Sequence, residues 1–199
     1  MRLGAIVVAG GRATRMGGVD KAAARIGGTR LIDVLLSELR AQHPAPATRD
    51  TVVVSARGLE VPGARVVAEQ PPFGGPVAAI AEGVAALDCD AVAILAVDAP
   101  FAPRLLPVLS DALGRHDVAA IRAADGYLQP LCAVWNAASL RTALAAFDSP
   151  AGIPVKALFN GADLVEVPGT GAERDADTLA ELAHLEPLLP GADTPERHC

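Results

Sequence analysis

The stretch from Gly4 to Lys21, GAIVVAGGRATRMGGVDK, runs from an apolar segment through a glycine turn to cations. The segment Gly4–Ala9 is short, rich in β-branched residues and bounded by glycines, which is typical of a strand buried on both faces of a parallel sheet. The pair Gly10–Gly11 lets backbone N–H groups approach a ligand, and Arg15 and Lys21 add positive charge nearby. This order predicts a site for a di- or triphosphate. A plain turn with scattered surface cations is the alternative.

The spacing of these residues matches neither of two common phosphate-binding motifs. A Walker A loop places its Lys between Gly and Ser or Thr, whereas Lys21 lies between Asp20 and Ala22. The dinucleotide fingerprint GxGxxG is not formed by Gly10–Gly11 and Gly17. P-loop ATPases and NAD-dependent enzymes are therefore disfavoured.

The composition indicates a single-domain enzyme of the cytoplasm. The 199 residues are 51% hydrophobic and only 3% aromatic, so aliphatic side chains must fill a sizeable core. The net charge of −6 argues against a nucleic-acid surface, and the three cysteines are too widely spaced for a disulfide framework. No apolar run approaches the roughly 20 residues that span a bilayer, and the regions of a signal peptide are missing. We therefore expect a cytoplasmic protein without nucleic-acid or membrane partners.

Short apolar runs alternate with helical periodicities along the rest of the chain. Further strands are predicted at 51–55, 65–68, 91–97, 118–122 and 131–135. Helices are predicted at 31–39, 77–87, 102–113, 137–147 and 179–185. The alternation predicts a single three-layer, Rossmann-like α/β domain with a mainly parallel sheet over residues 1–189, and a flexible tail over 190–199. Ligands of such sheets bind at the carboxyl ends of the strands.

Asp98 directly follows the predicted strand 91–97. In an open sheet it should project into the same crevice as the Gly10 loop. A carboxylate beside a polyphosphate requires a cation between the two, and Mg²⁺ binds carboxylate, phosphate and water oxygens. Asp98 is therefore the leading candidate metal ligand, and an N-cap of the helix that begins near Pro103 is the alternative.

Two more acids, Asp175 and Asp177, precede the predicted helix 179–185. Alternation puts both on one side of an extended segment, so both could face the metal. Asp177 could equally be the N-cap of the helix.

The loop from Glu69 to Pro76, EQPPFGGP, combines three prolines, which limit its freedom, with two glycines, which allow close backbone approach. Guanine presents two adjacent donors that one carboxylate such as Glu69 could accept together, whereas cytosine offers one on that edge. Glu69 therefore favours GTP over CTP. Ser55, at the end of a predicted strand, could also reach the base or be an ordinary strand-end hydroxyl.

These motifs together resemble the molybdenum cofactor guanylyltransferases, which belong to the MobA-like nucleotidyltransferases. The resemblance covers roughly residues 3–185. Its most specific part is the stretch 15–21, within the family signature LAGG, RMG and K. The matching residues here are Val8, Ala9, Gly10 and Gly11, then Arg15, Met16 and Gly17, then Lys21. The family's DxP motif falls at Asp98, its acid before a GPL segment at Glu69, and its DxDTP form at Asp175 to Thr178, with Leu179 in place of Pro.

The resemblance implies transfer of GMP from GTP to the molybdenum-molybdopterin cofactor, which yields the guanine dinucleotide cofactor and pyrophosphate. It implies Mg²⁺ as cofactor, with Asp98, Asp175 and Asp177 as metal ligands and with Arg15, Lys21 and Asp98 as catalytic residues. The expected nucleotide-binding set is Val8, Ala9, Gly10, Gly11, Lys21, Ser55, Glu69, Gly75 and Asp98. Gln129 and Pro130 resemble the acceptor segment, although the start of a strand explains them equally well. The acceptor phosphate is already ionised, so in-line attack needs charge neutralisation and alignment rather than a protein base.

Three other functions remain open at this point. A related enzyme could make the cytosine dinucleotide cofactor or activate a sugar or lactyl phosphate. A dinucleotide-dependent oxidoreductase is a second class. The third is a non-catalytic GTP-binding protein of molybdoenzyme assembly. For this protein and for the guanylyltransferase alike, the proteins that insert the cofactor or receive it are candidate partners.

Overall fold

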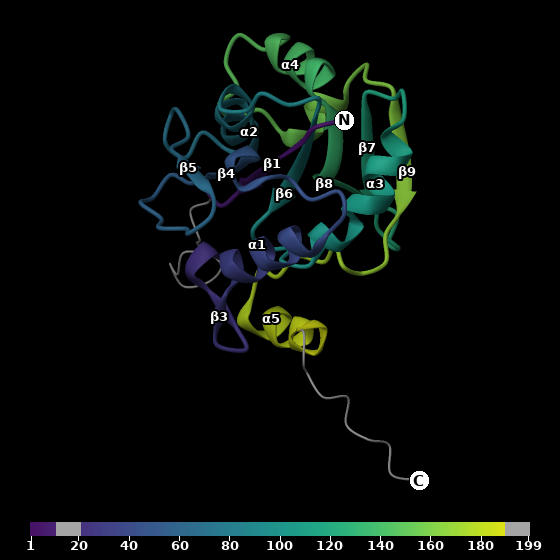
Figure 1. The fold of residues 1–199 in the computed structure, drawn as a ribbon. Helices are drawn as coiled ribbons and strands as arrows, with labels where there is room; N and C mark the ends of the chain where they lie inside the picture. The colour runs from purple at the N-terminus through teal and green to yellow at the C-terminus, as the bar shows by residue number, and fades with distance from the viewer. Residues whose placement is uncertain (11–20, 190–199) are drawn as a thin grey trace.

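The computed structural model describes residues 1–10 and 21–189, and its centre is a seven-stranded sheet with the order β5-β4-β1-β6-β8-β7-β9 (Figure 1). The strands are β1 (Leu3–Val8), β4 (Thr51–Val54), β5 (Arg65–Val67), β6 (Ala91–Ala96), β7 (Val118–Arg122), β8 (Leu128–Asn136) and β9 (Leu164–Pro168). In this sheet β8 runs antiparallel to its neighbours β6 and β7, and the other neighbouring strands pair in parallel. The prediction of a mainly parallel sheet is confirmed.

Helices cover both faces of the sheet and make three layers (Figure 1). They are α1 (Leu31–Ala41), α2 (Pro76–Ala85), α3 (Leu106–Leu113) and α4 (Ala137–Ala145), whereas α5 (Leu179–Leu185) lies beyond α1, away from the sheet. A short antiparallel pair, β2 (Arg25–Ile26) with β3 (Thr29–Arg30), precedes α1. On β1, Ala5 and Val7 join the apolar cluster under α1 and α3, whereas Ile6 and Val8 join the cluster under α2 and α4. The β-branched run at the start of the chain is therefore buried on both sides, as expected of a central parallel strand.

The structure differs from the predicted elements in the second half of the sheet. Strand β9 was not predicted, because it is an edge strand that pairs with β7, ends at Pro168 and lacks a continuous apolar pattern. The predicted helix 102–113 is a 3-10 turn, Ala102–Leu105, followed by α3. Pro107 in the first turn of α3 has no N–H to continue a preceding α-helix, so the regular helix starts afresh there.

The chain reverses its direction of travel across the sheet at β1. From β1 it passes through α1 to β4 and β5 on one side, and then returns to β6 on the other side of β1. Such a switch point leaves a crevice outside the carboxyl ends of the two strands. Gly10 follows β1 and Asp98 follows β6, so both lie at this switch point.

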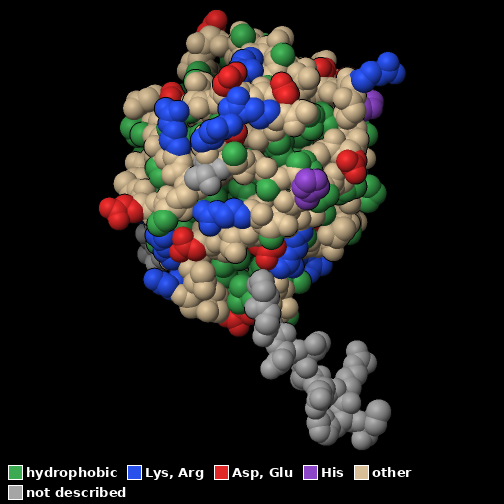
Figure 2. Space-filling model, viewed as in Figure 1, with side chains coloured by type: hydrophobic (Ala, Val, Ile, Leu, Met, Phe, Trp, Pro, Cys, Tyr) green, Lys and Arg blue, Asp and Glu red, His purple; other side chains and the backbone are tan. Residues whose placement is uncertain are grey.

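Acidic and basic side chains are interspersed on the face of the molecule shown in Figure 2. The described side chains form no broad basic field on that face, in keeping with a net charge of −6. None of the helices in residues 1–10 and 21–189 is long and apolar enough to cross a membrane.

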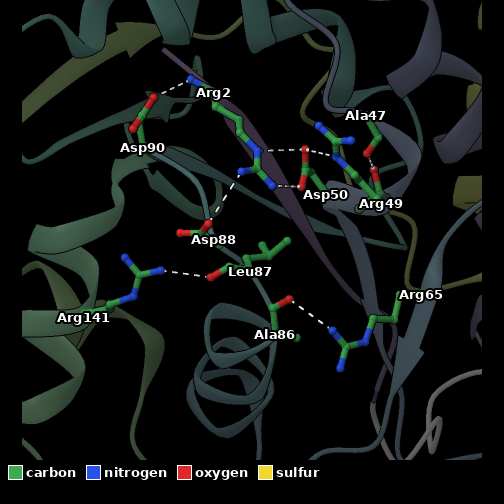
Figure 3. A network of polar contacts seen from close by, with 11 residues as sticks. Arg2, Ala47, Arg49, Asp50, Arg65, Ala86, Leu87, Asp88, Asp90 and Arg141 are labelled. Atoms are coloured by element: carbon green, nitrogen blue, oxygen red, sulfur yellow. Dashed lines mark hydrogen bonds and ion pairs between the residues drawn. The ribbon is translucent and has the colours of Figure 1, made fainter.

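A polar network closes the opposite, amino-terminal edge of the sheet (Figure 3). The Arg2 guanidinium donates to Asp50 through Nη2 at 2.7 Å and Nε at 3.1 Å, and the Asp50 side chain is only 6% exposed. The hydrogen bond from Arg2 lowers the pKa of Asp50 below its ordinary value. Arg2 precedes β1 and Asp50 precedes β4, so the pair fastens two neighbouring strands where they begin.

We expect Asp50→Asn to destabilise the fold in a pH-dependent way. Because the folded-state pKa of Asp50 lies below the unfolded value of about 3.9, its contribution is present above that value and is lost as the pH falls through the folded pKa. The free energy of unfolding of D50N, measured by urea titration, should therefore be lower than that of the native protein at neutral pH, with a smaller difference below about pH 4. The exposed Asp88, 3.7 Å from Arg2, supplies the control variant Asp88→Asn. A difference for D50N that does not change with pH would contradict the expectation.

Candidate functional site

Lys21 lies between two carboxylates at the carboxyl end of β6. Its Nζ is 2.7 Å from Oδ2 of Asp98 and also donates to Oδ1 of Asp177. Burial alone would lower the pKa of Lys21, but the hydrogen bonds to Asp177 and Asp98 outweigh it and raise the pKa. The ammonium group is therefore charged at neutral pH, and it compensates two acids that come from distant parts of the chain.

The C-terminal segment is attached to the end of β6 through its backbone. The N–H of Ala176 donates to the carbonyl oxygen of Asp98 at 2.9 Å, and the Ala176 side chain is completely buried. Its neighbours on either side, Asp175 and Asp177, are less buried. This bond brings the second acidic motif beside the first.

Neither Asp98 nor Asp177 serves as a helix cap. The N-cap of α5 is Thr178, whose side chain accepts from the Glu181 N–H in a reciprocal capping box. The 3-10 turn Ala102–Leu105 has Phe101 before it and no side-chain cap. Both capping alternatives from the sequence are therefore wrong, and the two carboxylates face Lys21 instead.

The donor set at this position is suited to Mg²⁺. Partial burial raises the pKa of Asp175, and the negative charges of the nearby Asp98 and Asp177 raise it further. No group of three or more His, Cys, Asp or Glu side chains in the described part of the chain is arranged to hold a metal ion by itself. Mg²⁺ is commonly held by one or two carboxylates together with substrate phosphates, and Asp98 and Asp177 fit that pattern.

Glu69 lies against the start of the loop that follows β1. Both of its carboxylate oxygens are 3.6 Å from the position that a Cβ atom would take on Gly10. The side chain is buried, which raises its pKa, and Oε1 accepts the Phe73 N–H at 2.6 Å. A buried acid thus lies next to the glycine turn, with one oxygen already used to shape its own loop.

Other predicted nucleotide-site residues gather at the same edge. The N–H of Ala9 donates to Val54 at 2.9 Å and the carbonyl of Val8 accepts from Val97 at 3.1 Å, which joins the ends of β4, β1 and β6. Ser55 follows β4, is buried and accepts the Arg57 N–H at 3.2 Å.

Gly75 is the N-cap of α2 with a φ of 97°, a conformation that favours glycine. Two predicted residues, Gly11 and Arg15, lie outside the described residues, as does the predicted tail 190–199.

The predicted acceptor residues Gln129 and Pro130 are the second and third residues of β8, and both are partly buried. Because β8 is antiparallel to β6 and Cys132 pairs with Leu95, the residues before Cys132 extend beyond the carboxyl end of β6, towards Asp98. Burial raises the pKa of Cys132 strongly, so its thiol stays protonated and acts as a small apolar side chain.

Arg104 is a supporting residue that the sequence motifs did not reveal. Its Nε and Nη2 donate to the Glu38 carboxylate of α1 at 2.8 and 2.7 Å, and Nη2 also donates to the Leu188 carbonyl at 2.8 Å. The guanidinium lies 4.5 Å above the Phe101 ring. One side chain therefore connects α1, the loop that follows Asp98 and the segment that follows α5. The partners lie 66 and 84 residues away, too far for any local pattern to indicate.

We expect Arg104→Met to lower the free energy of unfolding by about 2 kcal/mol, because it leaves the nearly buried Glu38 carboxylate, 9% exposed, without its partner. Urea unfolding checks this value. The double variant Glu38→Met with Arg104→Met should be more stable than R104M alone, because no unpaired charge remains. A double variant less stable than R104M would contradict this explanation.

Sequence comparisons show which proteins this chain is similar to. Residues 5–164 match the family model of the MobA-like NTP transferase domain. The molybdenum cofactor guanylyltransferase of Cereibacter sphaeroides is 32% identical over 200 residues, which cover 95% of this chain and 98% of the relative. A probable molybdenum cofactor guanylyltransferase of Natronomonas pharaonis is 31% identical, over 96% of this chain and 92% of the relative.

Solved structures share the fold at low sequence identity. The 2-C-methyl-D-erythritol 4-phosphate cytidylyltransferase of Thermus thermophilus superposes with a TM-score of 0.70 at 19% identity, over 94% of this chain and 98% of that one. The molybdopterin-guanine dinucleotide biosynthesis protein A of Archaeoglobus fulgidus has a TM-score of 0.67 at 19% identity, with the same coverage. With the family model spanning most of the chain and near full-length relatives above 30% identity, this chain belongs to the MobA-like nucleotidyltransferases.

Proposed function

We propose that this protein transfers GMP from GTP to the molybdenum-molybdopterin cofactor, forming the guanine dinucleotide cofactor and pyrophosphate. The observation that carries the proposal is the contact of Lys21 with both Asp98 and Asp177 at the switch point of the sheet, in a chain whose near full-length relatives are molybdenum cofactor guanylyltransferases. A cation and two carboxylates beside the glycine turn provide what a metal-bound triphosphate needs.

The proposed reaction needs alignment and charge neutralisation rather than a protein nucleophile. An oxygen of the acceptor phosphate attacks the α-phosphorus of GTP, so that a new oxygen–phosphorus bond forms. The bond between the α-phosphorus and the oxygen bridging to the β-phosphate breaks, and pyrophosphate leaves with the electron pair. The acceptor is a phosphate monoester already ionised near neutrality, so no base is required. Lys21 neutralises charge that develops during the transfer, together with Arg15, a role proposed from the sequence.

Mg²⁺ is proposed as the cofactor on the chemistry of the donor set. Asp98 and Asp177 would hold the ion together with phosphate oxygens, and the ion would neutralise charge on the triphosphate, whereas Asp175 would act by its negative charge nearby. Lys21 is proposed to contact the phosphates once Asp98 and Asp177 bind the metal.

The base and the acceptor are assigned to two other parts of the crevice. Glu69, buried beside Gly10, keeps lone pairs that can accept the two adjacent donors of guanine even with the Phe73 N–H on one oxygen. Gln129 and Pro130, beyond the end of β6, are proposed to contact the molybdopterin acceptor. We propose that the reaction takes place in the cytoplasm and that molybdoenzyme assembly proteins receive the product.

Pyrophosphate release tests the proposed function. Purified protein is incubated with GTP, CTP or ATP, with and without molybdenum cofactor, in Mg²⁺ or in a chelator. We expect release to be much faster from GTP than from CTP or ATP, and to require both acceptor and Mg²⁺. Faster release from CTP would overturn the assignment of Glu69 to guanine, and GTP binding without release under any condition would indicate a non-catalytic protein.

A further inference from the structure

Phe73 combines an exposed aromatic ring with a strained backbone. It is 41% exposed and belongs to neither apolar cluster of the core. Its φ is +58°, and among residues 1–10 and 21–189 no other non-glycine residue has a positive φ. A bulky residue in this region is an outlier, and such strain persists where the surrounding structure enforces it, most often at ligand sites.

Several contacts hold the Phe73 loop in place. The Phe73 N–H donates to Glu69, the Gly74 N–H donates to the Pro71 carbonyl at 2.9 Å, and the Gly74 carbonyl accepts from Gly152 at 2.8 Å. A Cβ on Gly74 would lie 2.9 Å from the Pro71 carbonyl oxygen, so the backbone is tightly packed there. These contacts fix the backbone of the loop, and the bond that Glu69 accepts is made by the same residue whose ring is partly exposed.

The place of Phe73 in the molecule points to the nucleotide crevice. The Phe73 N–H donates to the carboxylate of Glu69, and a Cβ added to Gly10 would lie 3.6 Å from both oxygens of the same carboxylate. Aromatic residues make up 3% of the chain, and the two largest fully buried side chains are Trp135 and Phe101. Phe73 thus keeps its ring outside the core while its backbone bonds to the proposed base-reading carboxylate, and this combination calls for a functional explanation.

We propose that Phe73 stacks on the base of the bound nucleotide and so acts as a specificity-determining residue of the proposed reaction. This inference rests on the proposed function, because it deepens the nucleotide site described above. Glu69 would contact the edge of the base and Phe73 its flat face. A purine offers more area for stacking than a pyrimidine, so Phe73 contributes to the preference for GTP over CTP, whereas Glu69 separates guanine from adenine.

Substitutions of Phe73 test the stacking role. Phe73→Ala should raise the KM for GTP and weaken binding of a fluorescent GTP analogue by about tenfold or more, with kcat changed little. It should also narrow the preference for GTP over CTP while leaving the preference for GTP over ATP. Phe73→Tyr and Phe73→Trp, which keep an aromatic face, should remain within about threefold of the native KM.

A glycine variant separates stacking from backbone strain. Phe73→Gly removes the ring and suits the positive φ, so it should unfold at the same temperature as the native protein or higher and still show the raised KM. Val108→Ala on α3 is the matched control, because Val108 is an apolar residue that is 44% exposed, and its KM should not change.

Three outcomes would overturn the role of Phe73 alone. The first is an unchanged KM for GTP in F73A, and the second is a rise of the KM in F73Y as large as that in F73A. The third is a change in the mass of the assembly of F73A, measured by light scattering, without a change of KM, which would make the ring a contact between protein chains. A native protein that binds no nucleotide at all would instead overturn the proposed function.

Discussion

Replacing Asp98 by Asn should lower pyrophosphate release from GTP by a factor of about 10²–10³, the usual size of the loss of one charge-stabilising group in an active site. Asp98 accepts one of the two contacts of the Lys21 ammonium and is the proposed Mg²⁺ ligand nearest the end of β6. The substitution should leave the fold intact, because the bond that attaches the C-terminal segment runs from the Ala176 N–H to the Asp98 backbone carbonyl.

Matched variants show whether the effect comes from the metal site. Asp177→Asn should also reduce turnover, and Asp175→Asn should reduce it less, because Asp175 is not in hydrogen-bond contact with Lys21 in the described structure. Asp88→Asn, which removes an equal charge at the opposite edge of the sheet, should have no effect on turnover. Part of the activity of D98N should return at higher Mg²⁺ concentration. Turnover of D98N within about threefold of the native rate, with an unchanged unfolding transition, would remove Asp98 from the catalytic site.

The position of the crevice could be predicted because it depends on local signals. A β-branched run before two glycines indicates a buried strand and a tight turn, and an acid directly after an apolar run marks the end of another strand. Parallel strands place their carboxyl ends at one edge, so Gly10 and Asp98 had to lie near each other if both strands were central. The pairing of β1 with β6 confirms that they are neighbours.

The direction of β8 was not predicted, although the sequence held a signal for it. Only residues 123–127 separate β7 from β8, which is too short for the crossover that a parallel pair needs. The hydrophobic periodicity also did not predict that β8 starts at Leu128 or that β9 exists, because partly exposed strands lack a continuous apolar run. The antiparallel direction of β8 matters for function, because it brings Gln129 and Pro130 to the edge that carries Asp98.

Side-chain pairings across long separations could not be predicted at all. Lys21 meets acids that are 77 and 156 residues away, and the motifs indicated a common edge but not this contact. Thr178 rather than Asp177 is the N-cap of α5, and the sequence held an unused signal for it, since Thr178 and Glu181 have the spacing of a capping box. The positive φ of Phe73, by contrast, is invisible in the sequence, because the neighbouring glycines are the residues expected to take such angles.

Replacing Lys21 by Ala should have opposite effects on turnover and on metal binding. Turnover should fall by a factor of about 10²–10³, because the cation that neutralises the triphosphate is lost. Binding of Mg²⁺ in the absence of nucleotide should become tighter, because Lys21 contacts both Asp98 and Asp177 and its ammonium must leave them before the ion can bind.

Isothermal titration of Mg²⁺ into nucleotide-free protein, next to pyrophosphate release, measures the two effects separately. Lys21→Met keeps much of the side-chain volume without the charge and should behave like the Ala variant, whereas Arg25→Met removes a nearby exposed cation and should change neither quantity. If K21A bound Mg²⁺ more weakly than the native protein, Lys21 would be holding Asp98 and Asp177 in the arrangement that binds the ion. It would then not be competing with Mg²⁺ for these carboxylates. If the affinity rises while turnover falls, Lys21 competes with Mg²⁺ for Asp98 and Asp177 and also neutralises the triphosphate during the transfer.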